Sequence, residues 1–285
     1  MIKEIKKSLV RSLMKKRDPN SHKGENGKVL IIGGSGDYHG APLLAGLGAL
    51  YSGADLVYLY VPESNFEVTR SMYPDFIVRK FAGEFLTESV VEEIVEFSKK
   101  CGAVVIGPGL GKSEESLSAA VKIVQGLTVP CVLDAEAINV LKKIEKFPLQ
   151  HPVVITPHRH EFQNLVDRDI NVKEGDPKSV ILLRSVSMDL HINVLLKGPV
   201  DYISSHEGFV EKNVTGNAGM TVGGSGDVLA GMVGTFLAQG MEAYDAARCA
   251  AFFSGYTGDL LRKRKGYCFS ASDIALTLPY GINEV

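Results

Sequence analysis

The apolar residues of this chain fall into short runs that alternate with segments of helical spacing. The clearest runs are Lys28–Gly34, Asp55–Pro62, Ala103–Gly109, Pro130–Glu136, Pro152–His158 and Asn193–Pro199. Runs that are apolar at consecutive positions are typical of strands in a parallel sheet that is covered by helices on both faces. The pattern therefore predicts an α/β fold with a central, mostly parallel sheet.

Residues 201–285 and the start of the chain add to this pattern. Residues 201–213, DYISSHEGFVEKN, predict two short strands around a turn, added in antiparallel fashion at the sheet edge, and the chain from Asp227 onwards reads as mainly helical. One face of an amphipathic helix is predicted within residues 1–20 by Ile2, Ile5, Leu9 and Leu13. We expect this helix to dock on the protein surface, with a membrane-surface anchor as the weaker alternative. Without a linker or low-complexity segment, residues 1–285 are expected to form a single domain.

Composition and charge narrow the functional classes. The chain has 285 residues, 45% of them hydrophobic, and a formal net charge of −2. This balance argues against nucleic acid or an anionic membrane surface as the main partner. The sequence contains neither a run of eighteen apolar residues nor a secretory signal at its start. The cysteines lack metal-type spacing, so we expect reduced thiols, two of them in the core, in a cytoplasmic protein: Cys101, Cys131, Cys249 and Cys268.

Two glycine-rich pentapeptides of similar sequence predict loops that approach a ligand closely. They are Gly33–Asp37, which follows a predicted strand, and Gly223–Asp227, which opens directly into an apolar helix. Backbone N–H groups at a helix start bind anions, so Gly224, Ser225 and Gly226 are expected to form an anion hole for a phosphate. The downstream loop has no lysine of its own and is not a Walker A motif.

Asp227 has two interpretations from its position. Aspartate is a favoured N-cap residue, and a carboxylate beside an anion hole can also accept a proton from a hydroxyl during phosphoryl transfer. The flanking glycines favour the second interpretation. The upstream loop superficially suggests a dinucleotide fingerprint with Glu63 as the ribose-binding acid, but its glycine spacing is GxGxxxG, so an oxidoreductase is the weaker hypothesis.

Six motifs that occur in order along the chain indicate its family. They are SHKGENGKVLIIGGSGDYHGAPLLAGLGALYSGADLVYLYVP, GPGLG, LDAEAIN, TPHRHEF, LLKG and GNAGMTVGGSGDVLAG, over residues 21–234. Together they resemble the ADP/ATP-dependent NAD(P)H-hydrate dehydratases, a carbohydrate-kinase-like branch of the ribokinase superfamily. The resemblance implies a three-layer ribokinase-like fold and a lyase that repairs nicotinamide nucleotides. In this reaction the hydroxyl of (6S)-NAD(P)H hydrate is phosphorylated and then expelled as phosphate. No epimerase domain is recognisable, so a stand-alone dehydratase is expected.

The resemblance also implies which residues hold each reactant. Hydrated NADH or NADPH is expected against Ala41, Gly109, His158 and Asp227, with Asp227 as the catalytic residue. The phosphoryl donor, ADP or ATP, is expected against Lys197, Gly198, Pro199, Val200, Asp201 and Gly226. Mg²⁺ is expected to bind through water at Glu161, and the site is expected to be oriented by Asp134 and Asn139. The two glycine loops then have different tasks, with the upstream residues Gly33–Gly40 and Ala41 shaping the pocket for the hydrated nicotinamide.

The chain departs from the family pattern at three places. Asp201 stands where KGxxT has a threonine, and a carboxylate there would weaken nucleotide binding unless it points away or meets a cation. Thr221 stands where a small apolar residue is common, and Arg159-His160 replaces a frequent Pro-Gly. None of these changes touches Asp227 or the anion hole.

Two other functions stay open on the sequence alone. A small-molecule kinase of the hydroxyethylthiazole or sugar type would use the same loop and aspartate but would release a stable phosphate ester. A non-catalytic nucleotide-binding protein would bind nucleotide without releasing phosphate. In every case the partners are small molecules, and we expect a homo-oligomer, with a tetramer as the leading candidate.

Overall fold

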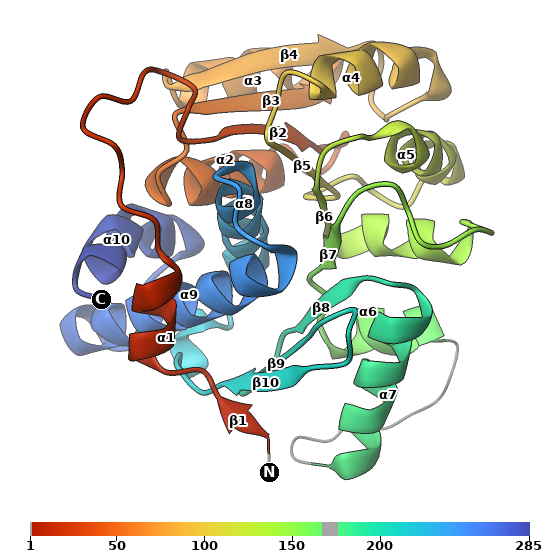
Figure 1. The fold of residues 1–285 in the computed structure, drawn as a ribbon. Coiled ribbons are helices and arrows are strands. Elements are labelled where there is room, and N and C mark those ends of the chain that lie inside the picture. Colours follow the sequence, from red (N-terminus) through yellow and green to blue (C-terminus); the bar gives the residue numbers. More distant parts are fainter. Residues whose placement is uncertain (1, 167–175) are drawn as a thin grey trace.

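The computed structural model describes residues 2–166 and 176–285 and joins the strands of these ranges in one ten-stranded sheet (Figure 1). The strand order is β1-β10-β9-β8-β7-β6-β5-β2-β3-β4. Their bounds are β1 Lys3–Glu4, β2 Lys28–Ile32, β3 Leu56–Pro62, β4 Phe76–Phe81, β5 Ala103–Ile106, β6 Cys131–Leu133, β7 Val153–Ile155, β8 Asn193–Leu196, β9 Asp201–Ser204 and β10 Val210–Asn213. Only β9 runs antiparallel to its neighbours within this sheet. The predicted parallel sheet and its antiparallel addition at residues 201–213 are confirmed.

Helices cover both faces of the sheet and make three layers (Figure 1). The helices are α1 Lys7–Leu13, α2 Gly40–Tyr51, α3 Glu63–Met72, α4 Val91–Ser98, α5 Glu114–Gly126, α6 Arg159–Val166, α7 Pro177–Asp189, α8 Ser225–Ala238, α9 Ala243–Lys265 and α10 Ala271–Asn283, with 3₁₀ turns η1 Glu88–Val90, η2 Ala135–Lys142 and η3 Ala218–Met220. Val29 and Ile31 of β2 belong to the core cluster that includes residues of α2, α8, α9 and α10, whereas Leu30 and Ile32 belong to the cluster on the other face, which includes residues of α4, α5, α6 and α7. Burial on both faces explains why the strands read as continuous apolar runs.

Glycines let α2 and α8 approach each other closely. A Cβ on Gly48 would lie 2.1 Å from the carbonyl oxygen of Val228, and one on Gly231 would lie 1.9 Å from that of Ala45. The Thr235 hydroxyl donates a hydrogen bond to the carbonyl oxygen of Ala49 at 2.9 Å, which ties the two helices together. These contacts position the start of α8 relative to the start of α2.

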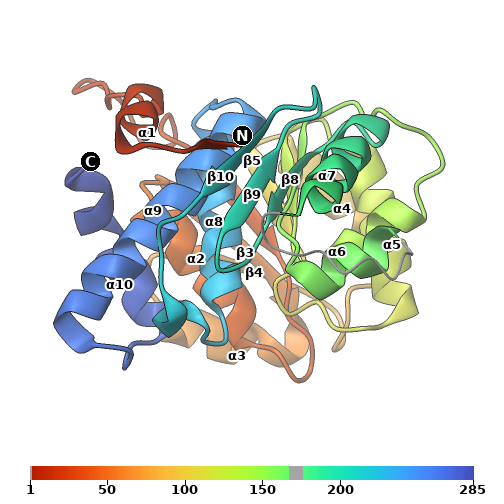
Figure 2. The same cartoon turned by 90° about the horizontal axis from the view of Figure 1, so that it is seen from below.

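The parallel strands direct the predicted functional residues to one edge of the sheet. The carboxyl ends of β2, β5, β6, β7 and β8 all lie there, and so do the start of β9 and the segment that leads from β10 into α8. Figure 2 shows this segment at the opposite end of the sheet from the chain start and α1. Ligands of such sheets bind beyond the carboxyl ends of the strands, so this edge is the candidate site.

The N-terminal segment differs from the prediction. The expected helix over residues 1–20 is only the seven-residue α1, and Lys3–Glu4 instead pairs with β10 as a parallel edge strand. Ile5 and Val10 are buried, so the segment docks on the protein as expected. The helix is short because β10 offers Lys3–Glu4 an unpaired edge, and backbone pairing there replaces the first helical turn.

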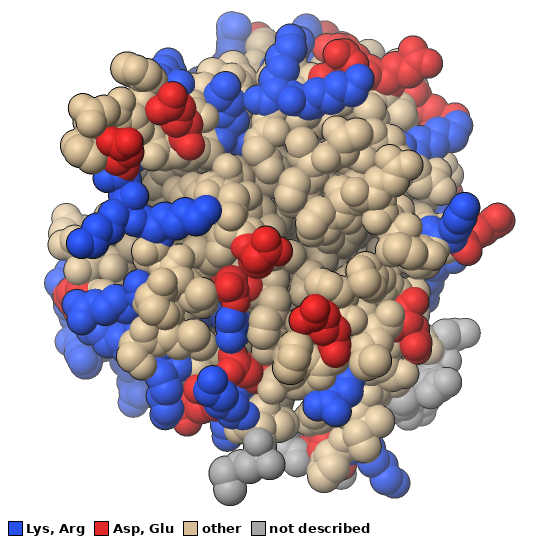
Figure 3. All heavy atoms as spheres, in the orientation of Figure 1, with Lys and Arg blue, Asp and Glu red and all other residues tan. Residues whose placement is uncertain are grey.

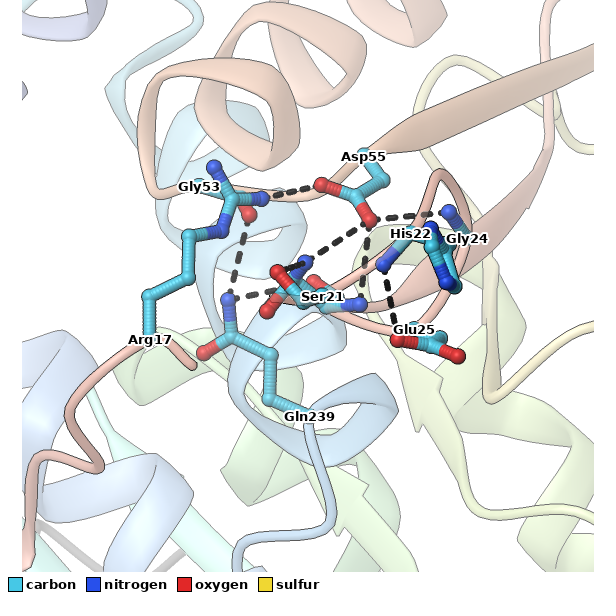
Figure 4. A network of polar contacts seen from close by, with 9 residues as sticks. Arg17, Ser21, His22, Gly24, Glu25, Gly53, Asp55 and Gln239 are labelled. Atoms are coloured by element: carbon cyan, nitrogen blue, oxygen red, sulfur yellow. Dashed lines mark hydrogen bonds and ion pairs between the residues drawn. The ribbon is translucent and has the colours of Figure 1, made fainter. Parts of the chain in front are cut away.

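A polar network anchors the next segment at the amino edge of the sheet (Figure 4). One oxygen of the Asp55 carboxylate accepts hydrogen bonds from the backbone of Gly24 and from both the backbone and the side chain of Asn26, and the other oxygen pairs with Arg17. These donors hold the pKa of Asp55 below its usual value against the opposing effect of burial. The SHKGENG part of the first motif therefore lies away from the carboxyl edge and has a structural task.

Four further features bear on the comparison with the sequence. The edge strand β4, FIVRKF, was not predicted, because only its two end residues, Phe76 and Phe81, are buried and its centre is half-exposed and partly charged. Three of the four cysteines are buried rather than two, and Cys268 is exposed. None of the helices in the described ranges is long and apolar enough to cross a membrane. On the face drawn in Figure 3, side chains of both charge signs are interspersed.

The contact between α2 and α8 gives a stability prediction. Gly48→Ala should lower the free energy of unfolding by about 2–4 kcal/mol, because the new methyl group meets a backbone carbonyl that cannot move aside. Thermal unfolding measures this loss. Gly40→Ala is the matched control, since a Cβ at Gly40 meets no atom of residues 2–166 or 176–285 within 4 Å. Equal melting temperatures for the two variants would contradict the close approach of the helices.

Candidate active site

The start of α8 presents free backbone N–H groups to the carboxyl edge. Gly224 is the N-cap residue, with a φ of +92° that favours glycine. Val228 donates the first hydrogen bond of the helix to the Gly224 carbonyl oxygen at 3.1 Å. The N–H groups of Gly226 and Asp227 precede this bond and have no partner within the helix. Of the predicted anion-hole donors, Ser225 already donates its N–H to the Val222 carbonyl oxygen at 3.4 Å, so the available donors include Gly226 and Asp227 in place of Ser225. Asp227 lies in the first turn and is not the N-cap, so the capping interpretation of this residue is wrong.

The glycines of the loop have different environments. Among the described residues, a Cβ on Gly226 would meet only the ammonium end of Lys197, at 3.0 Å, and one on Gly223 would meet nothing within 4 Å. A Cβ on Gly224 would instead lie 2.3 Å from Leu44 on α2. Gly226 and Gly223 thus leave room for a ligand, whereas Gly224 is required by its backbone conformation and by helix packing.

Lys197, at the end of β8, brings a positive charge to the start of α8. Its ammonium group lies 3.1 Å from Oδ1 of Asp134, which also accepts a hydrogen bond from the Thr156 hydroxyl at 2.6 Å. The Asp134 side chain is only 3% exposed and that of Lys197 is 20% exposed. Burial opposes the charge on Lys197, but the carboxylates around it outweigh this effect and raise its pKa. The loop has no lysine of its own, and the sheet supplies one.

The carboxylate of Asp227 has the protonation equilibrium of a base that works near neutral pH. Burial, together with the negative charges of Asp134 and Glu161, raises its pKa to about 7, and Lys197 opposes the rise. Within the described ranges, no hydrogen bond of the protein uses this carboxylate. It is therefore available to a substrate hydroxyl, and a pKa near the working pH suits proton transfer.

His158 and Glu161 form a reciprocal cap at the start of α6. The Glu161 carboxylate accepts the backbone N–H of His158 at 2.7 Å, and Nδ1 of His158 accepts the backbone N–H of Glu161 at 3.2 Å. The His158 ring stays largely exposed and lines the same cavity as Lys197. The two residues thus cap the helix and also face the site.

The residues of this site fit Mg²⁺ that is bound through water molecules, and not Mg²⁺ bound directly by a cluster of side chains. Among the described residues, no group of three His, Cys, Asp or Glu side chains could hold a metal ion. Mg²⁺ bound with nucleotides keeps several waters and uses one or two protein carboxylates besides the phosphates. Glu161, whose charge reaches both Lys197 and Asp227, is placed for such a contact.

A cavity of about 480 Å³ adjoins the start of α8. Its lining includes the predicted residues His158, Lys197, Gly198, Pro199, Asp201, Ser225 and Gly226. Val200 lines a separate cavity of about 180 Å³ on the other side of the β8–β9 turn, so the structure does not bring it together with Gly226. The larger cavity extends from Gly226 toward α9.

Asp201 points into the turn that carries the lysine. Its carboxylate accepts the backbone N–H of Gly198 and the side-chain amide of Asn213, each at 3.0 Å. Burial raises its pKa to about 6, and these two bonds and Lys197 limit the rise. The carboxylate thus closes the turn between β8 and β9 with hydrogen bonds to its own protein.

The upstream glycine loop packs against protein. The backbone N–H of Gly34 donates to the carbonyl oxygen of Pro108 at 2.9 Å, and the Ser35 hydroxyl donates to that of Gly109 at 2.9 Å. A Cβ on Gly109 would lie 3.0 Å from that of Ala41 and 2.9 Å from that of Tyr38. Ala41 and Gly109 are therefore neighbours, as a shared pocket requires. The dinucleotide-fingerprint hypothesis finds no support, because the Gly33–Gly34 backbone is occupied by Pro108.

The structure adds residues that the sequence analysis missed. The far end of the larger cavity is lined by Thr215, Gly216, Asn217, Leu229, Ala251, Ser254 and Gly255. Ala251, Ser254 and Gly255 are small residues three and four positions apart on α9, a spacing that places them on one helix face. This spacing was the available signal for a face that leaves room for a ligand.

The mostly parallel sheet flanked by helices, with a glycine-led helix start at its carboxyl edge, defines a ribokinase-like α/β fold. The family model described as NAD(P)H-hydrate dehydratase matches residues 29–280. The chain belongs to this family.

Individual relatives agree with this assignment. An ADP-dependent (S)-NAD(P)H-hydrate dehydratase of Nitrosopumilus maritimus is 35% identical over 95% of this chain and 94% of its own. The bifunctional NAD(P)H-hydrate repair enzyme of Methanothermobacter thermautotrophicus is 37% identical over 92% of this chain, which spans about half of that relative's length (51%). The structure of the ADP/ATP-dependent NAD(P)H-hydrate dehydratase of Bacillus subtilis, co-crystallised with ATP/Mg²⁺, superposes with a TM-score of 0.86 at 26% identity, covering 99% and 98% of the two chains.

The raised pKa of Asp227 predicts a pH-dependent effect on stability. The folded-state pKa of about 7 lies above the ordinary value of 3.8, so the ionised carboxylate disfavours the native state progressively as the pH rises from 4 through 7. Asp227→Asn should therefore raise the melting temperature by a few degrees at pH 8 and by much less at pH 4.5. Differential scanning calorimetry at both pH values measures the gap. A gap that is constant or shrinks toward pH 8 would contradict the electrostatic account.

The environments of Gly226 and Gly224 predict that substitution of the first weakens ADP binding and that substitution of the second lowers stability. Gly226→Val should reduce ADP affinity at least tenfold with a smaller loss of stability than Gly224→Val, because its side chain meets the ammonium end of Lys197 and the cavity but no backbone. Gly224→Val should instead lower the melting temperature, because it combines a left-handed backbone with a clash against Leu44. Calorimetric ADP titration and thermal unfolding of both variants separate the effects. Unchanged ADP binding in Gly226→Val would place the phosphates elsewhere.

Proposed function

We propose that this protein dehydrates (6S)-NAD(P)H hydrate to NAD(P)H, with ADP or ATP as the phosphoryl donor. The observation that carries the proposal is the unengaged Asp227 carboxylate, with a pKa of about 7, beside the start of α8 and a nucleotide-sized cavity. The activity agrees with the family to which the chain belongs. The residue roles that follow are inferred from this geometry.

Asp227 acts as the general base toward the hydroxyl of the hydrated nicotinamide ring. As the hydroxyl oxygen attacks the terminal phosphorus of the donor, the O–H proton passes to Asp227. The new P–O bond forms while the bond to the leaving nucleotide breaks, which releases AMP from ADP or ADP from ATP. The ring C–O bond then breaks, phosphate leaves with the bonding electrons, and loss of a ring proton restores the double bond.

The charge that develops on the transferring group meets two donors from this chain. The backbone N–H groups at the start of α8 lie on one side, and the Lys197 ammonium lies beside Gly226. Such donors are most effective where they are oriented before the reaction begins, and Asp134 holds Lys197 in this way. Glu161 would hold Mg²⁺ through water, and the ion would neutralise part of the phosphate charge.

The donor occupies the cavity between Lys197 and α9. Its phosphates lie at Gly226 and Ser225, and its nucleoside extends over the β8–β9 turn toward Ala251, Ser254 and Gly255, where small side chains leave space for a flat base. Asp201 is held away from the phosphates by Gly198 and Asn213. Its replacement of the family threonine is therefore compatible with nucleotide binding.

We propose further that the protein is a cytoplasmic homo-oligomer, with a tetramer as the leading candidate. Its reactants are nicotinamide and adenine nucleotides, which favours this location. Support for self-association comes from exposed apolar side chains on helices, among them Leu276 and Tyr280 on α10. Light scattering coupled to size-exclusion chromatography tests the oligomeric state.

A direct assay tests the activity. Hydrated NADH and hydrated NADPH are each incubated with ADP or ATP and Mg²⁺, and absorbance at 340 nm follows NAD(P)H formation. We expect absorbance to return with release of one phosphate, and kcat/KM to rise with pH up to about 7 and then level off, because Asp227 must be ionised.

Asp227→Asn is the informative variant for this assay. It should keep ADP affinity within several-fold and lose about 10²–10⁴-fold in turnover, because an amide cannot accept the hydroxyl proton. A stable phosphorylated product without return of absorbance would identify a small-molecule kinase. Nucleotide binding with no phosphate release would identify a binding protein.

A further inference from the structure

A second cavity opens on the other side of the reaction centre. It measures about 400 Å³ and is lined by Leu110, Gly111, Lys112, Ser113, Glu114, Leu117, Glu136, Asn139, Lys142, Lys143 and Asn164. It shares no lining residue with the donor cavity. These residues come from the loop after β5, the start of α5, η2 and α6, and we call the cavity the η2 groove.

The walls of the η2 groove continue directly from two expected substrate contacts. One wall begins at Leu110, the residue after Gly109, and the opposite wall includes Asn164 on α6, the helix that His158 precedes. The floor between them follows Asp134, the partner of Lys197, through Glu136 and Asn139 of η2. A substrate that touches Gly109 and His158 therefore lies at the mouth of this groove.

The groove carries more positive than negative charge. Its lining holds three lysines and two glutamates. Lys143 pairs with Glu114 at 2.5 Å, and Lys112, whose side chain is 87% exposed, lies 3.9 Å from Glu136. Lys142 has no ion pair among the described residues. At least one ammonium group is thus available to an incoming anion, and a second is only loosely paired.

The chemistry of the substrate matches this charge. Hydrated NAD(P)H is a dinucleotide, so beyond the hydrated ring it carries a diphosphate and an adenosine, and NADPH adds a 2′-phosphate. The donor nucleotide occupies the cavity on the β8–β10 side, which leaves the adenosine half of the dinucleotide to extend toward β5 and β6. We propose that the η2 groove binds this adenosine half, with Lys112 and Lys142 contacting its phosphates. The inference rests on the proposed function.

The double variant Lys112→Ala/Lys142→Ala tests the groove. At saturating ADP, the KM for hydrated NADPH should rise about tenfold, which corresponds to about 1.4 kcal/mol. The kcat and the KM for ADP should stay within twofold, because neither lysine lines the donor cavity. A rise shared with hydrated NADH would locate the diphosphate at the lysines, and a rise confined to hydrated NADPH would locate the 2′-phosphate there. Either result supports the groove.

A matched control separates an effect of the η2 groove from a general effect of removing a lysine. Lys122→Ala removes a lysine from α5 that pairs with Glu88 and does not line the groove, and it should leave every KM unchanged. An unchanged KM for both hydrates in the double variant, or an equal rise in the KM for ADP, would overturn the proposal.

Titration of NADP⁺ in the presence of ADP gives a readout that does not depend on turnover. Wild-type protein should bind NADP⁺ at least fivefold more tightly than the double variant. If the two proteins differ in this way in NADP⁺ affinity but wild-type protein has no dehydratase activity, the proposed role of the η2 groove is supported and the proposed function fails. Equal NADP⁺ affinities would overturn the groove even if the dehydratase activity is present.

Discussion

The ion pair between Lys197 and Asp134 is the interaction on which the rest of the site depends. It joins β8 to β6 at the carboxyl edge and holds an ammonium group beside Gly226 at the start of α8. Without Lys197, the carboxylates of Asp134 and Asp227 would face each other at a half-buried edge without a cation. With it, the pKa of Asp227 rises only to about 7, so that the residue is a base at neutral pH and not a permanently protonated acid.

Packing beneath the edge keeps this balance in place. The glycine contacts between α2 and α8 fix the position of α8 relative to α2. The same two helices carry Ala41 and Asp227. The start of α8 is thus supported from below by a close helix contact and approached from the sheet by Lys197. The site combines a rigid support with a carboxylate that its surroundings disfavour in the ionised state, which is a common cost of an active site.

The sequence predicted the layers and many of the residues that meet at the carboxyl edge, for physical reasons that also explain its failures. Apolar runs such as Val29–Ile32 are unambiguous because both faces of the strand are buried. The edge strands β1 and β4 lack that signal, since one side of each is open. Gly226 and Asp227 could be found because a glycine-led helix start is a local pattern. The contact of Lys197 with Gly226 is non-local, so no local pattern encodes it. The small-residue face of α9 has a local spacing, but that spacing does not say which cavity the face lines.

The central claim is that the added hydroxyl leaves as phosphate after Asp227 has taken its proton. The most direct measurement uses hydrated NADPH that carries ¹⁸O in this hydroxyl, with unlabelled ADP as donor, and follows the label by mass spectrometry. If the account is right, the ¹⁸O appears in inorganic phosphate in proportion to the NADPH formed, because the ring C–O bond breaks after the P–O bond has formed. Recovery of the ¹⁸O in water, with unlabelled phosphate, would contradict it.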